Sequence, residues 1–171
     1  MNRHPDGIAL ILRALHHGER SLERHLLVVA ERHRTEHEVH HVAVDVARWS
    51  REHAARLAEA GRAHGLDLSA PGEESTPAGA SGPLAALREK TAELLGRRPE
   101  PALLLLHDLR ELYLAASDNS LHWEMLAQAA QAANDSELLA LASACHPQTL
   151  RQIRWANTLI KTLAPQALTS V

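Results

Sequence analysis

Apolar residues recur every three or four positions along most of this chain, which places them on one face of an α-helix. From Gly7 to about Glu31 the stripe consists of Ile8, Leu12, Leu15, Leu22, Leu26 and Val29. The position missing between Leu15 and Leu22 is Glu19. A carboxylate inside an apolar stripe is costly to bury unless it is paired or coordinated. Glu19 is therefore either a paired, buried group or an edge residue in water.

A second helix is expected from Thr35 to about Ala63. Thr35 and Glu38 have the spacing of a capping box, in which each side chain bonds the backbone amide of the other residue. Gly61 and Gly65 mark the end of the helix. The first two helices then form a hairpin. Because the region of the turn lacks both Gly and Pro, one uninterrupted helix is the alternative, and it would build the bundle between subunits.

Residues 66–100 connect the second helix to the third as one long crossover. Its first half, 66–82, is rich in Pro, Gly, Ser and Ala, which is typical of a loop. Pro83 is expected to begin one short extra helix that ends at Gly96. Pro101 is well placed at the first position of the next long helix.

The third long helix is expected over about 101–132 and the fourth from Asn134 to about Ala164. The apolar face of the third is expected to carry Leu114, Leu121 and Met125, with Asp118 between them. The apolar face of the fourth is expected to carry Leu139, Leu150, Ile153 and Ile160, with His146 and Asn157 on the same stripe. The sequence Ser-Asp-Asn-Ser at 117–120 predicts a distortion, Pro147 predicts a kink, and Glu137 completes a cap with Asn134.

Two short hairpins separated by a long crossover predict an all-α fold, a four-helix bundle in a single domain of residues 1–171. This order resembles the ferritin-like four-helix bundle over residues 7–164 and implies that the second and third helices run parallel. An up-down bundle, or helical hairpins paired in a dimer, would give a similar pattern.

The resemblance also implies a metal centre built from one Glu on each of two helices and a Glu-x-x-His pair on each of the other two. Glu19 matches the first carboxylate. The chain has only one Glu-x-x-His, Glu38–His41, which lies at the hairpin tip, and His146 has Ser143 where the motif needs Glu. A carboxylate-rich di-iron centre, and with it ferroxidase activity, is therefore not expected.

The helix heights predict a different site. Glu19, Trp49 and Asp118 fall in one layer, and His53, His122 and His146 fall about one turn, or ~5 Å, away. The carboxylates and imidazoles of these layers, Glu19, His53, Asp118, His122 and His146, are predicted to line one buried pocket that holds a transition metal, iron or zinc, because both accept mixed nitrogen and oxygen ligands. A second cluster lies at the hairpin tip, where His37, His41 and Asp45 could chelate a cation with Glu31 or His33 in reach; the alternative is a solvated surface.

Composition narrows the function classes. The 171 residues include 13 His, one Cys and no Phe, with a formal charge of −3. No basic face, membrane-length apolar run or signal pattern stands out, so neither nucleic acid nor membrane is an expected partner. The single cysteine fits the cytoplasm. Three hypotheses remain: metal binding in the bundle core, a metal-free interaction or assembly module that forms homo-oligomers, and a metal-dependent oxidoreductase.

Overall fold

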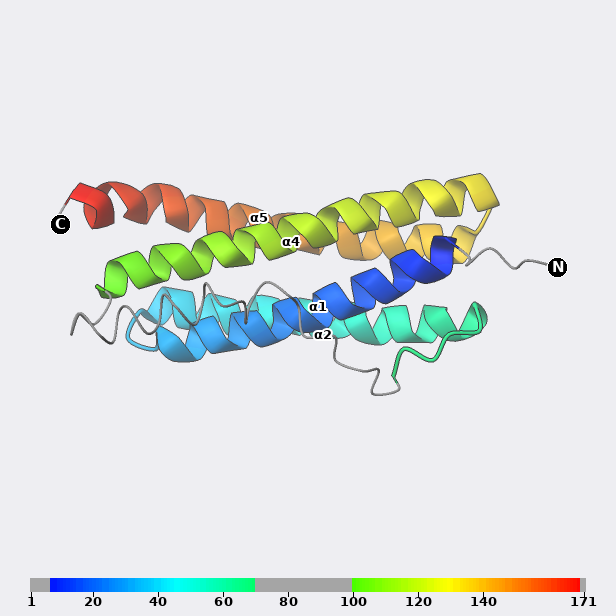
Figure 1. Cartoon of the computed structure of the whole chain (residues 1–171), viewed down its shortest axis with the longest axis horizontal. Coiled ribbons are helices and arrows are strands. Elements are labelled where there is room, and N and C mark those ends of the chain that lie inside the picture. The colour runs from blue at the N-terminus through cyan, green and yellow to red at the C-terminus, as the bar shows by residue number, and fades with distance from the viewer. Residues whose placement is uncertain (1–6, 70–99, 170–171) are drawn as a thin grey trace, which may run out of the picture.

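The computed structural model describes residues 7–69 and 100–169. These residues form four long helices and no strand (Figure 1). The helices are α1 (Gly7–Arg32), α2 (His37–Ala63), α4 (Pro101–Ala133) and α5 (Ser136–Thr169). The prediction of an all-α four-helix bundle is confirmed.

The helices pair as two antiparallel hairpins, α1 with α2 and α4 with α5, which pack against each other through α1–α4 and α2–α5 contacts. In Figure 1, α2 and α4 run in the same direction, and α2 ends at the end of the bundle opposite to the start of α4. The predicted parallel orientation of these two helices is confirmed. The short helix expected from Pro83 to Gly96 lies outside the described residues.

The turn between α1 and α2 differs from the predicted capping box. Helix α2 begins at His37, and no side chain caps it. The turn is closed instead by the Glu36 amide, which donates to the His33 carbonyl at 3.0 Å. The His40 imidazole also donates from Nδ1 to the Ala30 carbonyl at 2.8 Å, satisfying one of the unpaired carbonyls that end α1. Thr35 is exposed in this turn.

The end of α2 was correctly predicted. The Leu66 amide donates to the Gly61 carbonyl at 2.9 Å and the Gly65 amide donates to the Arg62 carbonyl at 3.1 Å. These two bonds make a Schellman motif. Gly65 has φ +70°, a left-handed conformation that glycine adopts without a steric penalty.

Helix α4 is uninterrupted through 117–120, so the predicted distortion does not occur. Its apolar face was also assigned to the wrong side. The residues that face the core are Leu105, Leu109, Leu112, Ala116, Asn119, Trp123, Leu126 and Ala130. Leu114, Leu121 and Met125 lie on the opposite side and are 46%, 62% and 46% exposed.

Helix α5 begins and ends later than predicted. Asn134 terminates α4 in a left-handed conformation (φ 55°), and Asp135 caps α5 by accepting the Leu138 amide at 3.0 Å. The helix continues through Pro147 and Pro165 to Thr169. The core-facing residues are Leu138, Leu141, Ala142, Cys145, Thr149, Gln152 and Ala156, whereas Leu150 is exposed.

The core consists of two apolar clusters, one towards each end of the bundle. The cluster near the α1–α2 turn includes Leu22, Leu26, Val29, Val39, Leu105, Leu109 and Leu112. The cluster near the α4–α5 turn includes Leu12, Leu15, Leu57, Trp123, Leu126, Leu138 and Cys145. Across residues 7–69 and 100–169, no helix is long and apolar enough to cross a membrane.

Candidate functional site

Six buried polar side chains lie between the two apolar clusters and come from all four helices. We call them the mid-bundle cluster: Glu19 of α1, Ser50 and His53 of α2, Asn119 of α4, and Thr149 and Gln152 of α5. On each helix they occupy the positions where the apolar stripe is interrupted. Burying a polar side chain costs free energy unless it finds a partner. The presence of six such side chains at one level of the bundle indicates that they belong to one site.

Glu19 is the only acidic member of the cluster and is fully buried. The Trp123 indole Nε1 donates to Glu19 Oε1 at 2.9 Å. Nδ1 of His53 lies 3.3 Å from the same oxygen, and the His53 ring packs edge-on against Trp123. On its other side, His53 Nε2 donates to Oε1 of Gln148 at 2.7 Å. These contacts fix the orientation of both the carboxylate and the imidazole.

The remaining members of the cluster join α2 to α5 and α1 to α4. The Gln152 amide donates to the Val46 carbonyl at 3.0 Å and to the Ser50 hydroxyl at 2.9 Å. Asn119 lies directly over Gly18 of α1, where a Cβ atom would come 2.1 Å from Asn119 Oδ1. Glycine at position 18 therefore permits the close approach of α1 and α4 at this level.

We expect Gly18→Ala to destabilise the protein by about 1–3 kcal/mol, because the added methyl group collides with the buried Asn119 side chain. In an unconstrained helix interior the same change stabilises by about 1 kcal/mol. Urea unfolding, followed by circular dichroism, measures whether the free energy of unfolding rises or falls. Gly18→Ala combined with Asn119→Ala is the matched control and should recover most of the loss. A stabilising single variant would contradict the packing described here.

The mid-bundle cluster also contains most of the unpaired buried polar atoms. Within the part of the chain that the structure describes, six buried side-chain atoms lack a hydrogen-bond partner. Five of them belong to the cluster: Glu19 Oε2, His53 Nδ1, Asn119 Nδ2, Thr149 Oγ1 and Gln152 Oε1. Native proteins pair nearly all buried polar atoms with protein, water or ions. The unpaired buried polar atoms of the described residues are therefore concentrated in this layer.

The five residues predicted to share a metal pocket are only partly brought together. Glu19 and His53 meet at 3.3 Å. The Asp118 side chain is 70% exposed, and His122 bonds the Asp118 carbonyl of its own helix at 2.9 Å. His146 is paired with the Ser120 hydroxyl at 2.7 Å. The expectation of one shared pocket is wrong for Asp118, because the side of α4 that it occupies faces solvent.

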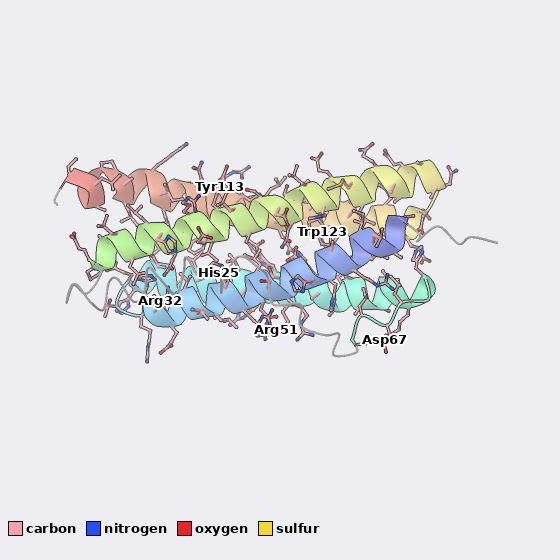
Figure 2. The ribbon with its side chains drawn as sticks, in the orientation of Figure 1. His25, Arg32, Arg51, Asp67, Tyr113 and Trp123 are labelled. Atoms are coloured by element: carbon pink, nitrogen blue, oxygen red, sulfur yellow. The ribbon has the colours of Figure 1, made fainter. Side chains whose placement is uncertain are left out.

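The hairpin-tip histidines also divide into buried and exposed groups. His33 is buried, and its Nε2 donates to Asp108 Oδ2 of α4 at 2.8 Å, while Arg32 bonds the same carboxylate at 2.8 and 3.0 Å. His37 and His41 are exposed. Figure 2 shows Arg32 at the end of the bundle where α1 meets α2, far along the bundle from Trp123. His33 therefore links the α1–α2 turn to α4 and does not form a cluster with the exposed His37 and His41.

His25 faces the same region, and burial lowers its pKa from 6.5; Arg32 and His107 act in the same direction and Asp108 and Glu111 oppose them. The unfolded chain therefore takes up this proton before the folded protein does. We expect the free energy of unfolding to fall as the pH drops from about 7 to about 5. His25→Gln should reduce this dependence, and His41→Gln, on the exposed tip, should leave it unchanged. Equal pH profiles for both variants would contradict the assignment.

Cys145 lies in the core beside Arg56, whose Nη1 is 3.5 Å from the sulfur. Burial raises the pKa of the Cys145 thiol to about 11, mainly by excluding water from the thiolate. We expect iodoacetamide near neutral pH to react with the folded protein about 100-fold more slowly than with the urea-unfolded chain. Mass spectrometry of the alkylated fraction measures both rates. Comparable rates would show that the thiol is accessible.

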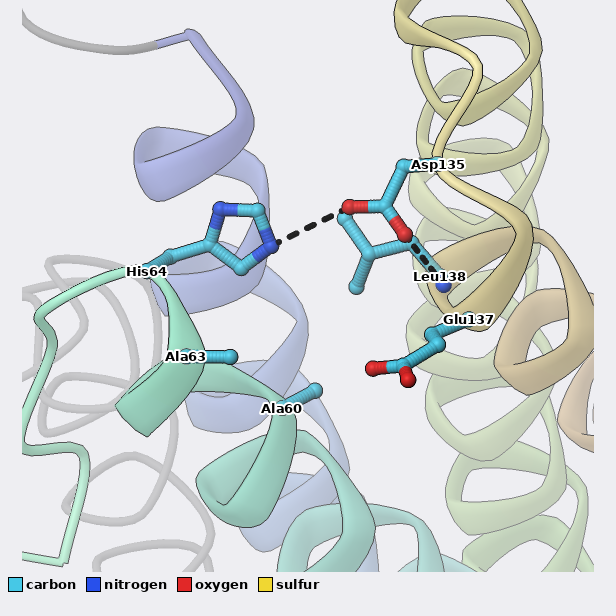
Figure 3. A pocket seen from close by; sticks show the side chains of 6 residues that line it. All are labelled: Ala60, Ala63, His64, Asp135, Glu137 and Leu138. Carbon is cyan, nitrogen blue, oxygen red and sulfur yellow. Dashed lines mark hydrogen bonds and ion pairs between the residues drawn. The ribbon is translucent and has the colours of Figure 1, made fainter.

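The end of the bundle opposite to the α1–α2 turn carries a small open pocket of about 210 Å³ (Figure 3). It is lined by Ala60, Ala63, His64, Asp135, Glu137 and Leu138. His64 Nε2 lies 3.4 Å from Asp135 Oδ2, so the two groups form an ion pair when the imidazole is protonated. Because Asp135 also caps α5, this contact ties the end of α2 to the α4–α5 turn and has a structural role.

Comparison with protein-family models, curated proteins and solved structures finds no match for this chain. The ligands that the site could bind are therefore inferred from the donor atoms of its side chains. Residues 7–69 and 100–169 contain no group of three or more His, Cys, Asp and Glu side chains placed to hold a metal ion. Of the mid-bundle cluster, only Glu19 and His53 carry strong transition-metal ligands.

Proposed function

We propose that this chain is a ferritin-like bundle that works without a di-metal centre and acts as a helical module that assembles with a second copy of itself. The mid-bundle cluster carries the first part of the proposal. Ferritin-like di-metal proteins place single Glu residues on two helices and Glu-x-x-His pairs on the other two. Here the same pattern of one, two, one and two buried positions is filled by Glu19, Ser50-x-x-His53, Asn119 and Thr149-x-x-Gln152.

This substitution pattern removes the charge that a di-metal centre needs. The family pattern supplies four carboxylates, which balance two divalent ions. Glu19 is the one carboxylate in this cluster, and the hydroxyl and amide groups at the other positions are neutral. Sequence reasoning overlooked Ser50, Asn119, Thr149 and Gln152 because it searched for Glu and His. The three-residue spacing of Ser50 to His53 and of Thr149 to Gln152 was the available signal.

The assembly part of the proposal is supported by the exposed apolar face of α4, on which Leu114, Leu121 and Met125 lie. Soluble monomers seldom leave several large apolar side chains exposed along one helix face unless a partner covers them.

Two measurements on chelator-washed protein test the proposal. Elemental analysis after dialysis against iron and zinc should find well below two metal ions per chain, and sedimentation velocity should find a concentration-dependent dimer. Two tightly bound ions per chain would overturn the first part. A monomer at every concentration would overturn the second. The two parts can therefore fail separately.

A second candidate function is the binding of one divalent transition metal by Glu19 and His53. It is favoured by the unpaired Glu19 Oε2 and His53 Nδ1 atoms, which are buried in the same layer. Any metal-dependent oxidoreductase activity would depend on this site. Calorimetric titration with Zn²⁺ tests it: Glu19→Gln and His53→Asn should each abolish binding, and His37→Asn, on the exposed tip, should not. Retention of binding in both core variants would contradict this candidate.

A further inference from the structure

The outward face of α4 is unusual for a helix of a four-helix bundle. Leu114, Leu121 and Met125 are all about half exposed, and the core face of the same helix lies on the opposite side. Leu114 and Leu121 are seven residues apart, which is close to two helical turns or ~10 Å along the axis. They therefore form one apolar line on the surface.

Two residues of opposite charge flank this line. Arg110 precedes Leu114 by four residues, and Glu124 follows Leu121 by three. Both are exposed. With about 100° of rotation per residue, Arg110 and Glu124 lie to the same side of the line through the two leucines. The midpoint between Arg110 and Glu124 falls within one residue of the midpoint between Leu114 and Leu121.

This arrangement is self-complementary under a two-fold axis. When two copies of α4 pack antiparallel about that midpoint, Leu114 of one copy faces Leu121 of the other. The same operation brings residues on one flank of the first helix against the same flank of the second, so Arg110 faces Glu124 of the second copy. Each contact occurs twice, as in every isologous interface.

We infer that the outward face of α4 is the interface of a homodimer, in which two α4 helices pack antiparallel with Leu114 against Leu121 and Arg110 against Glu124. The inference rests on the proposed function and names the surface that performs it. The occupant is a second copy of this chain because both the apolar line and the charge pair are complementary to themselves. A partner of different sequence would not require this symmetry.

One residue on the same face opposes the association. Asp118 lies within one residue of the midpoint, so the Asp118 carboxylates of the two copies are near each other across the axis. Like charges at an interface disfavour association. Asp118→Asn should therefore tighten the dimer several-fold, which a face uninvolved in association would not do.

Sedimentation velocity on the full chain tests the interface. Leu121→Lys should raise the dissociation constant of the dimer by roughly tenfold or more, because it buries a charge against the opposing leucine. Leu10→Lys, at a 50% exposed leucine on α1, is the matched control and should leave the constant unchanged. Circular dichroism should show that both variants keep the helical content of the parent protein.

A charge exchange gives a sharper test. Arg110→Glu and Glu124→Arg should each weaken the dimer by roughly two- to tenfold, because each creates two like-charge contacts. The double variant should restore the original constant, and added salt should reduce the differences. Recovery in the double variant requires that the two positions meet across the interface.

The outcomes separate the interface from the proposed function. A dimer that is insensitive to Leu121→Lys and to the charge exchange would overturn the α4 interface and leave self-assembly standing. A monomer at every concentration would overturn both. A monomeric parent protein that loses stability in Leu121→Lys would show that another segment of the same chain covers α4.

Discussion

Glu19→Leu should lower the free energy of unfolding by about 3–5 kcal/mol, the largest effect that we expect from any single substitution in α1. The carboxylate accepts the Trp123 indole N–H and lies beside His53 Nδ1, and all three groups are buried. Removing it leaves the indole N–H without its acceptor in the core and takes the neighbouring carboxylate away from the His53 imidazole. A buried group that loses its partner pays its desolvation cost without compensation. Urea unfolding at neutral pH measures the change.

A double-mutant cycle separates the lost pairing from the lost packing. His53→Leu alone should also be strongly destabilising, because it leaves the Glu19 carboxylate buried beside apolar groups. Glu19→Leu with His53→Leu should recover a large part of the combined loss, since replacing both members of a buried pair is often near neutral. Additive losses in the double variant would contradict the pairing.

Glu23→Leu provides the comparison within the same helix. Glu23 lies one turn from Glu19 and pairs with Arg51 at 2.6 Å; the Glu23 side chain is 18% exposed, but the Arg51 side chain is 64% exposed, so water reaches the pair. Surface ion pairs contribute about 0–1 kcal/mol. The comparison of these two glutamates therefore tests whether full enclosure of the pair, and not the charge alone, sets the free-energy cost of removing the carboxylate.

The first hairpin could be predicted from the sequence because its apolar and charged positions are clearly separated. In α1 the buried apolar residues are mostly leucines, in α2 they are Val, Ala and Leu, and the polar residues of both helices are mostly charged or His, so the pattern marks the core face. Glu19 was recognised as a candidate core position, with an edge position in water as the alternative, because it filled the one gap in an aliphatic stripe. The end of α2 was predictable because Gly65 adopts a left-handed conformation that favours glycine.

The second hairpin was harder to predict because both sides of its helices carry large apolar residues. In α4 the core face uses Ala116, Asn119 and Ala130 where the helices approach closely, while Leu114 and Leu121 face outward. A search for the most apolar stripe therefore selects the surface side. Because the outward face of α4 was assigned to the core, Asp118 was predicted to be a core ligand. Asn119, its buried neighbour, was overlooked.

The turn was mispredicted for a different reason. A capping box is a local signal, but the start of α2 is set by contacts from α1 and α4. His33 is held by Asp108, 75 residues away in the sequence, and His40 bonds the last turn of α1. Such tertiary contacts override a local preference worth about 1 kcal/mol. Local sequence alone contains no information about them.

Asp108→Ala should have the second-largest effect, a loss of about 3 kcal/mol in the free energy of unfolding. The Asp108 carboxylate is buried and accepts bonds from His33 Nε2 and from Arg32 Nη1. Its removal leaves the buried His33 imidazole unpaired and frees the turn between α1 and α2 from α4. Asp108→Asn keeps one acceptor oxygen and should lose less.

Asp45→Ala is the control for that prediction, because the Asp45 side chain is 66% exposed and lies on α2, outside the proposed α4 interface. Its stability should change by no more than about 0.5 kcal/mol. Amide hydrogen exchange locates the effect: in Asp108→Ala, protection should fall first at Glu36 and His40, whose amides bond within the turn and the start of α2. A uniform loss of protection over all four helices would show that Asp108 stabilises the whole bundle and not the turn. Unchanged exchange at these amides would show that His33 holds the turn without Asp108.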